Sequence, residues 1–150
     1  MSLSNSEFMK TFKEVVASRG LKFTKQRGAI AEVVVSGAKH LTLDDILLKA
    51  REKHPSVGYA TVYRTMKLMV MCGLVLENKF SDGPARYERA DVEHHDHMIC
   101  VKCGKIEEFE HPEIERLQHR LAESMGFTVV AHKHEVYVEC ADGECLTEQQ

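Results

Sequence analysis

The sequence lacks the features that mark membrane-bound, secreted or disordered chains. Its longest apolar stretch, residues 66–76, is interrupted by Lys67 and is far too short to span a bilayer, which takes about 20 apolar residues in a helix. The amino terminus lacks the basic-then-apolar pattern of a signal peptide. There is no low-complexity tract, and only the polar ends, about residues 1–5 and 147–150, suggest disorder. We therefore expect a cytoplasmic globular protein that has no membrane partner.

Charge is distributed unevenly along the 150 residues, which are enough for one sizeable domain or two small ones. Residues 1–89 hold 15 Lys and Arg against 9 Asp and Glu, whereas residues 90–150 hold 5 against 14. Seven of the nine histidines and four of the five cysteines also lie in the second part. Random variation in surface charge would be the plain explanation. The pattern favours a basic domain for a polyanion, residues 1–89, joined to a metal-binding domain, residues 90–150.

The first part has the pattern of several helices followed by a two-stranded ribbon. Apolar residues recur at helical spacing, and Thr24 and Thr42 stand where N-caps of the second and third helices are expected. A fourth helix is expected over residues 59–72. Residues 74–79 and 86–89 predict strands joined by a turn. This order predicts a winged helix-turn-helix, a common DNA-binding fold.

The fourth helix would be the recognition helix. Thr61, Tyr63 and Arg64 lie early in it, where base edges are usually reached. An arginine can bind guanine through two hydrogen bonds, and a tyrosine can contact a thymine methyl or a phosphate. Lys22 could reach backbone phosphate or an adjacent minor groove. The alternative is that these residues are solvated charges and a core tyrosine.

Four cysteines form two closely spaced pairs, Cys100 with Cys103 and Cys140 with Cys145. Two such turns can bring four thiolates onto one tetrahedral structural zinc ion. The alternatives are a redox-active pair or four unrelated thiols. A redox pair is expected at the start of a helix, but here a glycine and a strand-like segment follow the first pair. The fifth cysteine, Cys72, is expected to be a core residue.

Before the first cysteine pair stands the run His94-His95-Asp96-His97. In an extended segment alternate side chains point to opposite faces, so His94 and Asp96 would separate from His95 and His97. This spacing predicts two mixed nitrogen and oxygen metal sites. Each needs further ligands from elsewhere, because two ligands hold a divalent ion poorly.

The rest of the second part predicts a scaffold that associates with a partner. Pro112 suits the first turn of a helix whose apolar stripe is ended by Gly126, and residues 127–130 and 136–138 predict strands. About sixty residues bury little surface alone, so a second subunit is expected, although the stripe could equally be ordinary core.

Together these motifs resemble the ferric uptake regulator (Fur) family. The resemblance rests on residues 58–64, on residues 94–97 and on the two cysteine pairs, and it runs from about Leu21 to Cys145. It implies an α+β fold with an amino-terminal winged helix-turn-helix and a carboxyl-terminal α/β dimerisation domain with a four-cysteine zinc site. It implies a transcriptional repressor rather than an enzyme. Metal loading would fix the angle between the domains, so that a homodimer or higher oligomer fits an A/T-rich palindromic operator.

The resemblance also assigns roles by position. A regulatory hinge site would use His40, Glu88, His95, His97 and Glu108. A site within the dimerisation domain would use His94, Asp96, Glu115 and His132. His134 has the same strand parity as His132, and the family pattern selects His132. The lysine for the minor groove matches Lys22, and the base-contacting pair matches Tyr63 and Arg64.

The sensed metal follows from ligand chemistry. Zn²⁺ is expected at the cysteines, while histidine and carboxylate ligands suit Fe²⁺ or Mn²⁺ better, although Zn²⁺ would bind them too. Peroxide-sensing relatives tend to carry aspartate where Glu88 and Glu108 stand, and zinc sensors tend to place a cysteine at the Glu88 position. Iron sensing is favoured, with peroxide or manganese sensing as alternatives. The remaining alternatives are a constitutive zinc-stabilised DNA-binding protein and a zinc-dependent hydrolase, for which no substrate-pocket signature is present.

Overall fold

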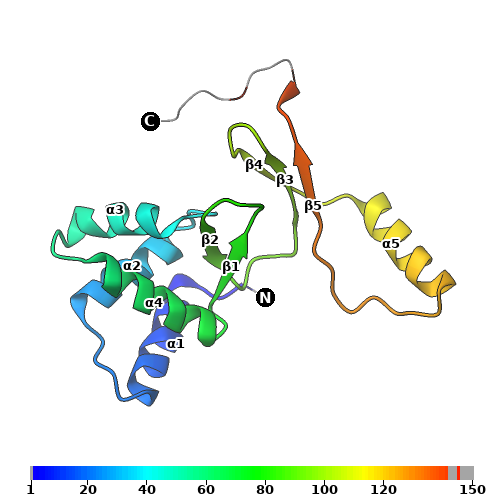
Figure 1. Cartoon of the computed structure of the whole chain (residues 1–150). Helices are drawn as coiled ribbons and strands as arrows, with labels where there is room; N and C mark the ends of the chain where they lie inside the picture. Colours follow the sequence, from blue (N-terminus) through cyan, green and yellow to red (C-terminus); the bar gives the residue numbers. More distant parts are fainter. Residues whose placement is uncertain (1, 142–144, 146–150) are drawn as a thin grey trace. The chain divides into compact units, whose positions relative to one another are not determined.

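The computed structural model describes residues 2–141 and Cys145, and it divides into two compact units, Met1–Glu93 and His94–Gln150 (Figure 1). The described residues form five helices, a two-stranded sheet and a three-stranded sheet. This confirms the predicted α+β fold. The division into functional domains at residues 89 and 90 stays a prediction.

Three of the four helices of the first unit begin at a side chain that caps them, and the fourth begins after Gly58. The four are α1 (Asn5–Ser18), α2 (Lys25–Val35), α3 (Leu43–Lys53) and α4 (Tyr59–Met71). Thr24 accepts a hydrogen bond from the backbone N–H of Arg27, and Thr42 forms a capping box with Asp45, as the sequence predicts. The helices enclose a core whose largest fully buried members are Phe8, Phe12, Ile30, Ile46, Met66 and Met69.

The predicted ribbon is an antiparallel hairpin of β1 (Val75–Lys79) and β2 (Ala85–Arg89), so the first unit is a winged helix-turn-helix. Its turn includes Ser81, whose φ of 53° lies in the left-handed region. Residue pairs across the hairpin alternate between its two faces. Asn78 lies opposite Arg86 on one face, and Glu77 lies opposite Tyr87 on the other.

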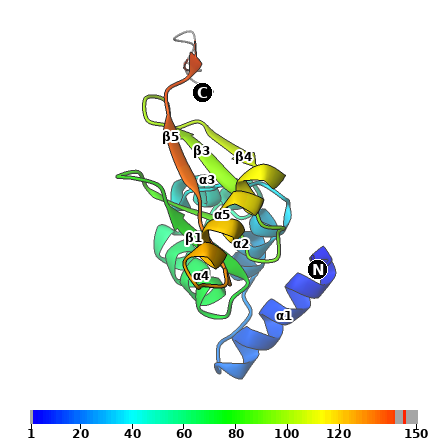
Figure 2. The same cartoon turned by 90° about the vertical axis from the view of Figure 1, so that its right-hand side faces the viewer.

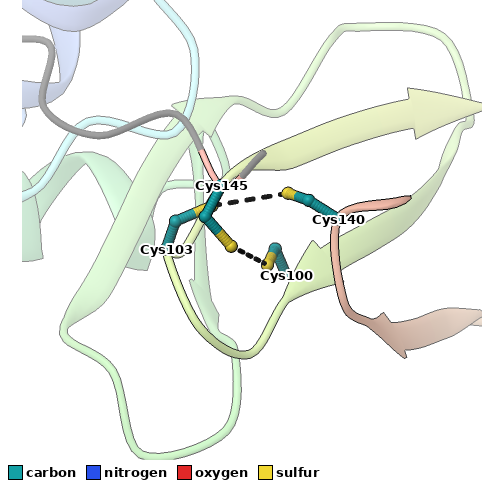
Figure 3. Close-up of side chains that lie close together, drawn as sticks. All are labelled: Cys100, Cys103, Cys140 and Cys145. Carbon is teal, nitrogen blue, oxygen red and sulfur yellow. Dashed lines mark hydrogen bonds between the residues drawn. The ribbon is translucent and has the colours of Figure 1, made fainter. Parts of the chain in front are cut away.

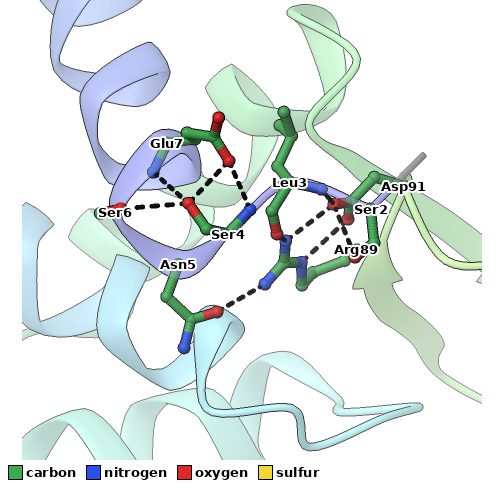
Figure 4. Close-up of polar contacts among 8 residues, drawn as sticks. All are labelled: Ser2, Leu3, Ser4, Asn5, Ser6, Glu7, Arg89 and Asp91. Carbon is green, nitrogen blue, oxygen red and sulfur yellow. Dashed lines mark hydrogen bonds and ion pairs between the residues drawn. The ribbon is translucent and has the colours of Figure 1, made fainter.

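The residues that precede α1 are tied to the end of β2 (Figure 4). The guanidinium of Arg89 donates to the carbonyl of Leu3 at 2.6 Å and to the side chain of Asn5 at 2.8 Å. It also forms two hydrogen bonds with the carboxylate of Asp91, which accepts the backbone N–H of Leu3. The cation lies 5.1 Å from the ring centroid of Phe8. These contacts join the first and last segments of the unit.

The second unit is built on a sheet with the order β4-β3-β5 (Figures 1 and 2). The central strand β3 (Asp96–Cys100) pairs antiparallel with β4 (Ile106–Phe109) and parallel with β5 (Glu135–Val138). Between β4 and β5 lies α5 (Pro112–Ser124), which begins with the predicted proline and has no buried residue.

The predicted strand at residues 127–130 is wrong, because this segment links α5 to β5 without entering a described strand. Its side chains include Phe127 and Val130, the latter 96% exposed. A β-branched sequence forms a strand only where a neighbouring strand offers hydrogen bonds and packing.

None of the described helices is long and apolar enough to cross a membrane.

Candidate metal centres and nucleic-acid interface

The four paired cysteines converge in the second unit (Figure 3). The sulfur atoms of Cys100 and Cys145 lie 3.5 Å apart, those of Cys103 and Cys140 lie 3.7 Å apart, and all four are within 4.8 Å of one another. Gly104, with a φ of 74°, makes the turn after the first pair. A tetrahedral zinc ion with Zn–S bonds of about 2.3 Å separates its sulfurs by about 3.8 Å. The sulfur–sulfur distances of 3.5 and 3.7 Å are therefore close to those around such an ion.

The charges of these thiols are strongly linked. Backbone N–H groups, chiefly that of Cys103, lower the pKa of Cys100 to about 6. The hydrogen bond with Cys100, together with burial, raises the pKa of Cys140 to about 12. Thiolates this close repel one another, so ionising all four needs a cation among them. None of the five cysteines, all of which are described, forms a disulfide.

A second cluster surrounds the carboxylate of Asp96, which is 1% exposed. Its Oδ1 lies 3.4 Å from Nε2 of His94 and 3.4 Å from Nε2 of His132. His132 Nε2 also lies 3.2 Å from Oε1 of Glu115, near the start of α5. Ligands bonded to one divalent ion at about 2.1 Å are separated by about 3.0–3.5 Å. The structure thus brings together the four residues that the family pattern assigned to this site.

His134, which sequence parity alone could not separate from His132, lies on the other side of the same carboxylate. Its Nδ1 is 3.7 Å from Oδ2 of Asp96. It does not join the group in which the ligand atoms of His94, Asp96, Glu115 and His132 all lie within 4.8 Å.

Two of the predicted hinge ligands belong to the first unit. His40 Nδ1 lies 3.9 Å from Oε2 of Glu88, which is on β2. The other oxygen of Glu88, Oε1, accepts a hydrogen bond from Asn78 Nδ2 at 2.9 Å. His40 has a φ of 56°, and its carbonyl accepts a hydrogen bond from Arg86 Nη1 at 2.9 Å. Sequence reasoning missed Asn78 and Arg86. The one indication was that both have the same strand parity as Glu88, and parity shows which side chains are neighbours only when the hairpin register is known.

The other three predicted hinge ligands belong to the second unit. Nε2 of His95 lies 3.4 Å from Oε1 of Glu108, and the rings of His95 and His97 are 4.8 Å apart between centroids. His97 on β3 is paired in register with Glu108 on β4. His95 and His97 are thus grouped apart from the cluster of His94 and Asp96, which is the separation that the alternation predicts.

The predicted recognition helix α4 presents polar side chains at its beginning. Tyr63 is 47% exposed, so it is not a core tyrosine, and Arg64 is also exposed. The ammonium group of Lys67 lies 5.6 Å from the centroid of the Tyr63 ring. Lys22 is exposed on the loop between α1 and α2. Thr61 is half-buried.

Comparison with known proteins gives the same family as the motifs. The model of the ferric uptake regulator family matches residues 18–137. The chain belongs to the ferric uptake regulator family. Members of this family are metal-responsive transcriptional regulators and not enzymes, which removes the hydrolase alternative.

Individual relatives agree over nearly the whole length. The ferric uptake regulation protein of Campylobacter jejuni is 37% identical over 147 residues, which cover 95% of this chain and 94% of that protein. The structure of the Helicobacter pylori ferric uptake regulator, described as having three functional metal binding sites, matches with a TM-score of 0.87, 29% identity and complete coverage of both chains. A zinc-bound manganese uptake regulator matches with a TM-score of 0.71 and 37% identity, covering 87% of this chain and 98% of that one.

Proposed function

We propose that this Fur-family regulator is a repressor that binds an A/T-rich palindromic operator as a homodimer when Fe²⁺ occupies its hinge site. The observation that carries the proposal is the distribution of the hinge ligands. His40 and Glu88 belong to the first unit, and His95, His97 and Glu108 belong to the second. The first unit supplies two of the five proposed ligands, and two ligands hold a divalent ion poorly, so tight binding would draw on both units.

A bound cation would supply the energy that favours one arrangement of the two units. By thermodynamic linkage, an arrangement that binds operator DNA better must then also bind the metal better. The donor set of histidines and carboxylates suits Fe²⁺ or Mn²⁺ on ligand softness, and Zn²⁺ would compete under the Irving–Williams order. Manganese sensing is the nearest alternative, and the similarity to a manganese uptake regulator supports it. Peroxide sensing is a further alternative.

In this proposal the other two clusters have different roles. Zn²⁺ is held by Cys100, Cys103, Cys140 and Cys145, and it stabilises the second unit because so small a unit gains folding energy from a metal. The cluster of His94, Asp96, Glu115 and His132 binds a further divalent ion that supports the same unit.

The contact with DNA is assigned to α4 and the segment before α2. Thr61, Tyr63 and Arg64 would reach base edges in the major groove, and Lys22 would reach the backbone or an adjacent minor groove. The basic balance of residues 1–89 supports a polyanionic partner.

Dimerisation is assigned to the second unit, which has several exposed large apolar residues. On α5 and the segment after it, the side chains of Leu117, Leu121, Met125 and Phe127 are each at least 60% exposed. A contiguous apolar face of this kind is costly in water and favours a self-complementary contact with a second copy.

Operator binding measured against metal tests the proposal. DNA duplexes that this protein selects from a random pool in the presence of Mn²⁺ would be titrated with protein plus Fe²⁺, Mn²⁺, Zn²⁺, Co²⁺ or Ni²⁺, the iron under anaerobic conditions. Fe²⁺ and Mn²⁺ should strengthen binding by at least tenfold, and the combined substitution of His95→Ala and His97→Ala should abolish that gain. Metal-independent binding with unchanged affinity in the variant would instead favour a constitutive zinc-stabilised DNA-binding protein.

A further inference from the structure

We propose that Asn78 and Arg86 are positioning residues for the metal ligands Glu88 and His40. The inference rests on the proposed role of His40 and Glu88 in the hinge site. Asn78 and Arg86 are cross-strand partners in the hairpin of β1 and β2. Because side chains alternate along a strand, Asn78, Arg86 and Glu88 share one face of the hairpin.

Asn78 fixes the orientation of the Glu88 carboxylate. Its amide nitrogen donates to Oε1 of Glu88 at 2.9 Å, which leaves Oε2 directed at Nδ1 of His40, 3.9 Å away. A carboxylate whose one oxygen is engaged in this way offers the other to a cation in a fixed direction. Without Asn78, the carboxylate could rotate and would lose orientation before a metal binds.

Arg86 acts on His40 through the backbone. His40 has a φ of 56°, in the left-handed region that residues other than glycine adopt uncommonly. Arg86 Nη1 donates to the carbonyl of His40 at 2.9 Å. The next residue, Leu41, exchanges two backbone hydrogen bonds with Tyr87, at 3.2 and 2.8 Å. Hydrogen bonds to β2 therefore hold the backbone at the carbonyl of His40 and at the following residue, Leu41.

The two contacts have a common consequence. One face of the hairpin carries Glu88 itself and also holds both ligands of the first unit in place. The ordering of the ligands is then part of the folded domain and is not left to the metal. Residues that orient metal ligands typically change metal affinity by about 10- to 100-fold when they are removed.

The test measures metal affinity in the full-length, zinc-loaded protein. A His132→Ala background removes the proposed second His/carboxylate site, so that one Mn²⁺ per chain is expected in an electron paramagnetic resonance titration. In that background Asn78→Leu and Arg86→Leu should each weaken Mn²⁺ binding by about tenfold or more. Arg86→Lys, which keeps a cationic donor, should recover part of the affinity. Co²⁺ absorption should change in shape for the leucine variants.

Arg51→Leu is the matched control. The Nε atom of Arg51 donates to the carbonyl of Val57 at 2.8 Å in the same unit, so this variant also loses one bond from an arginine to a carbonyl. It should melt at a lower temperature and bind Mn²⁺ like the parent. Where a leucine variant folds poorly, Asn78→Ala and Arg86→Gln replace it, with zinc content as the measure of an intact second unit.

A metal-free measurement and a ligand variant complete the design. Arg86→Leu should speed hydrogen exchange of the Leu41 amide in the protein without Mn²⁺. Replacing both His40 and Glu88 by alanine should abolish the remaining Mn²⁺ site. If it does not, the proposed hinge site is wrong and the positioning roles fall with it. If it does, but Asn78→Leu and Arg86→Leu bind Mn²⁺ like the parent, the hinge site stands and the positioning roles are overturned.

Discussion

The hydroxyl of Tyr87 donates a hydrogen bond to the carboxylate of Glu77 at 2.7 Å, directly across the β1–β2 hairpin. The same carboxylate oxygen accepts a hydrogen bond from the ammonium group of Lys67 on α4, at 3.0 Å. Lys67 in turn lies against the ring of Tyr63. The hairpin face opposite Asn78 and Arg86 is thus joined to the predicted recognition helix.

Tyr87→Phe should lower the free energy of unfolding by about 1 kcal/mol, because a half-buried carboxylate loses a hydrogen-bond donor. Burial raises the pKa of Tyr87, and the bond to Glu77 raises it further, so the hydroxyl stays a donor throughout the physiological range. Urea unfolding measures the change. Tyr137→Phe is the control, since its hydroxyl also donates to a carboxylate, that of Glu135, but at an exposed position where the loss should be within about 0.5 kcal/mol. Equal losses in the two variants would contradict a special role for the Glu77 contact.

Asp91→Asn should remove a pH-dependent part of the stability. The Arg89 guanidinium holds the pKa of Asp91 at about 2, below its ordinary value of 3.8. A lowered pKa in the folded state stabilises the protein above the ordinary value, and this stabilisation is lost as the pH falls through about 2. The variant should therefore be less stable by about 2 kcal/mol at pH 7 and should converge on the parent near pH 2.

Urea titrations of both proteins between pH 7 and pH 2 provide the comparison. Asp82→Asn, at an exposed position in the turn of the hairpin, serves as the control and should follow the parent at every pH. A stability difference for Asp91→Asn that does not shrink below pH 4 would show that the contact with Arg89 is not its source.

Cys103→Ser should lose the proposed structural zinc. Only three of the clustered sulfurs would remain, whereas a structural zinc ion takes four protein ligands. Metal analysis should find about one zinc fewer per chain, with a lower melting temperature for the second unit. Cys72→Ser is the matched variant, since Cys72 lies in the first unit, where its thiol donates to the carbonyl of Met69. Retention of zinc by Cys103→Ser would refute the four-cysteine site.

Local chemistry made much of this fold predictable from sequence. Thr24 and Thr42 cap helices because their side chains can satisfy backbone N–H groups only at a helix start, and the structure confirms both. The separation of His94 and Asp96 from His95 and His97 likewise follows from the alternation of an extended chain.

What the sequence could not supply were relationships between distant segments. The pairing of Asn78 with Arg86 depends on a register that their own residue types do not encode. The strand predicted at residues 127–130 was wrong for a similar reason. Apolar, β-branched composition favours a strand but does not show whether a neighbouring strand is present to pair with it. The four-cysteine cluster was easier to predict, because the short spacing within each pair already places its two sulfur atoms close together.

The choice between His132 and His134 is the sharpest case, and it yields the last prediction. Both histidines have the same parity, yet His132 Nε2 lies 3.4 Å from Asp96 Oδ1 and 3.2 Å from Glu115 Oε1. His134 Nδ1 instead lies 3.7 Å from the other oxygen of Asp96, Oδ2. His132→Ala should therefore remove the divalent ion of this cluster and leave the zinc content unchanged. His134→Ala should retain that ion, with an affinity within about tenfold of the parent. Metal analysis after gel filtration, which counts Mn²⁺ per chain, shows which of the two histidines holds the ion. Loss of the ion in His134→Ala but not in His132→Ala would reverse the assignment.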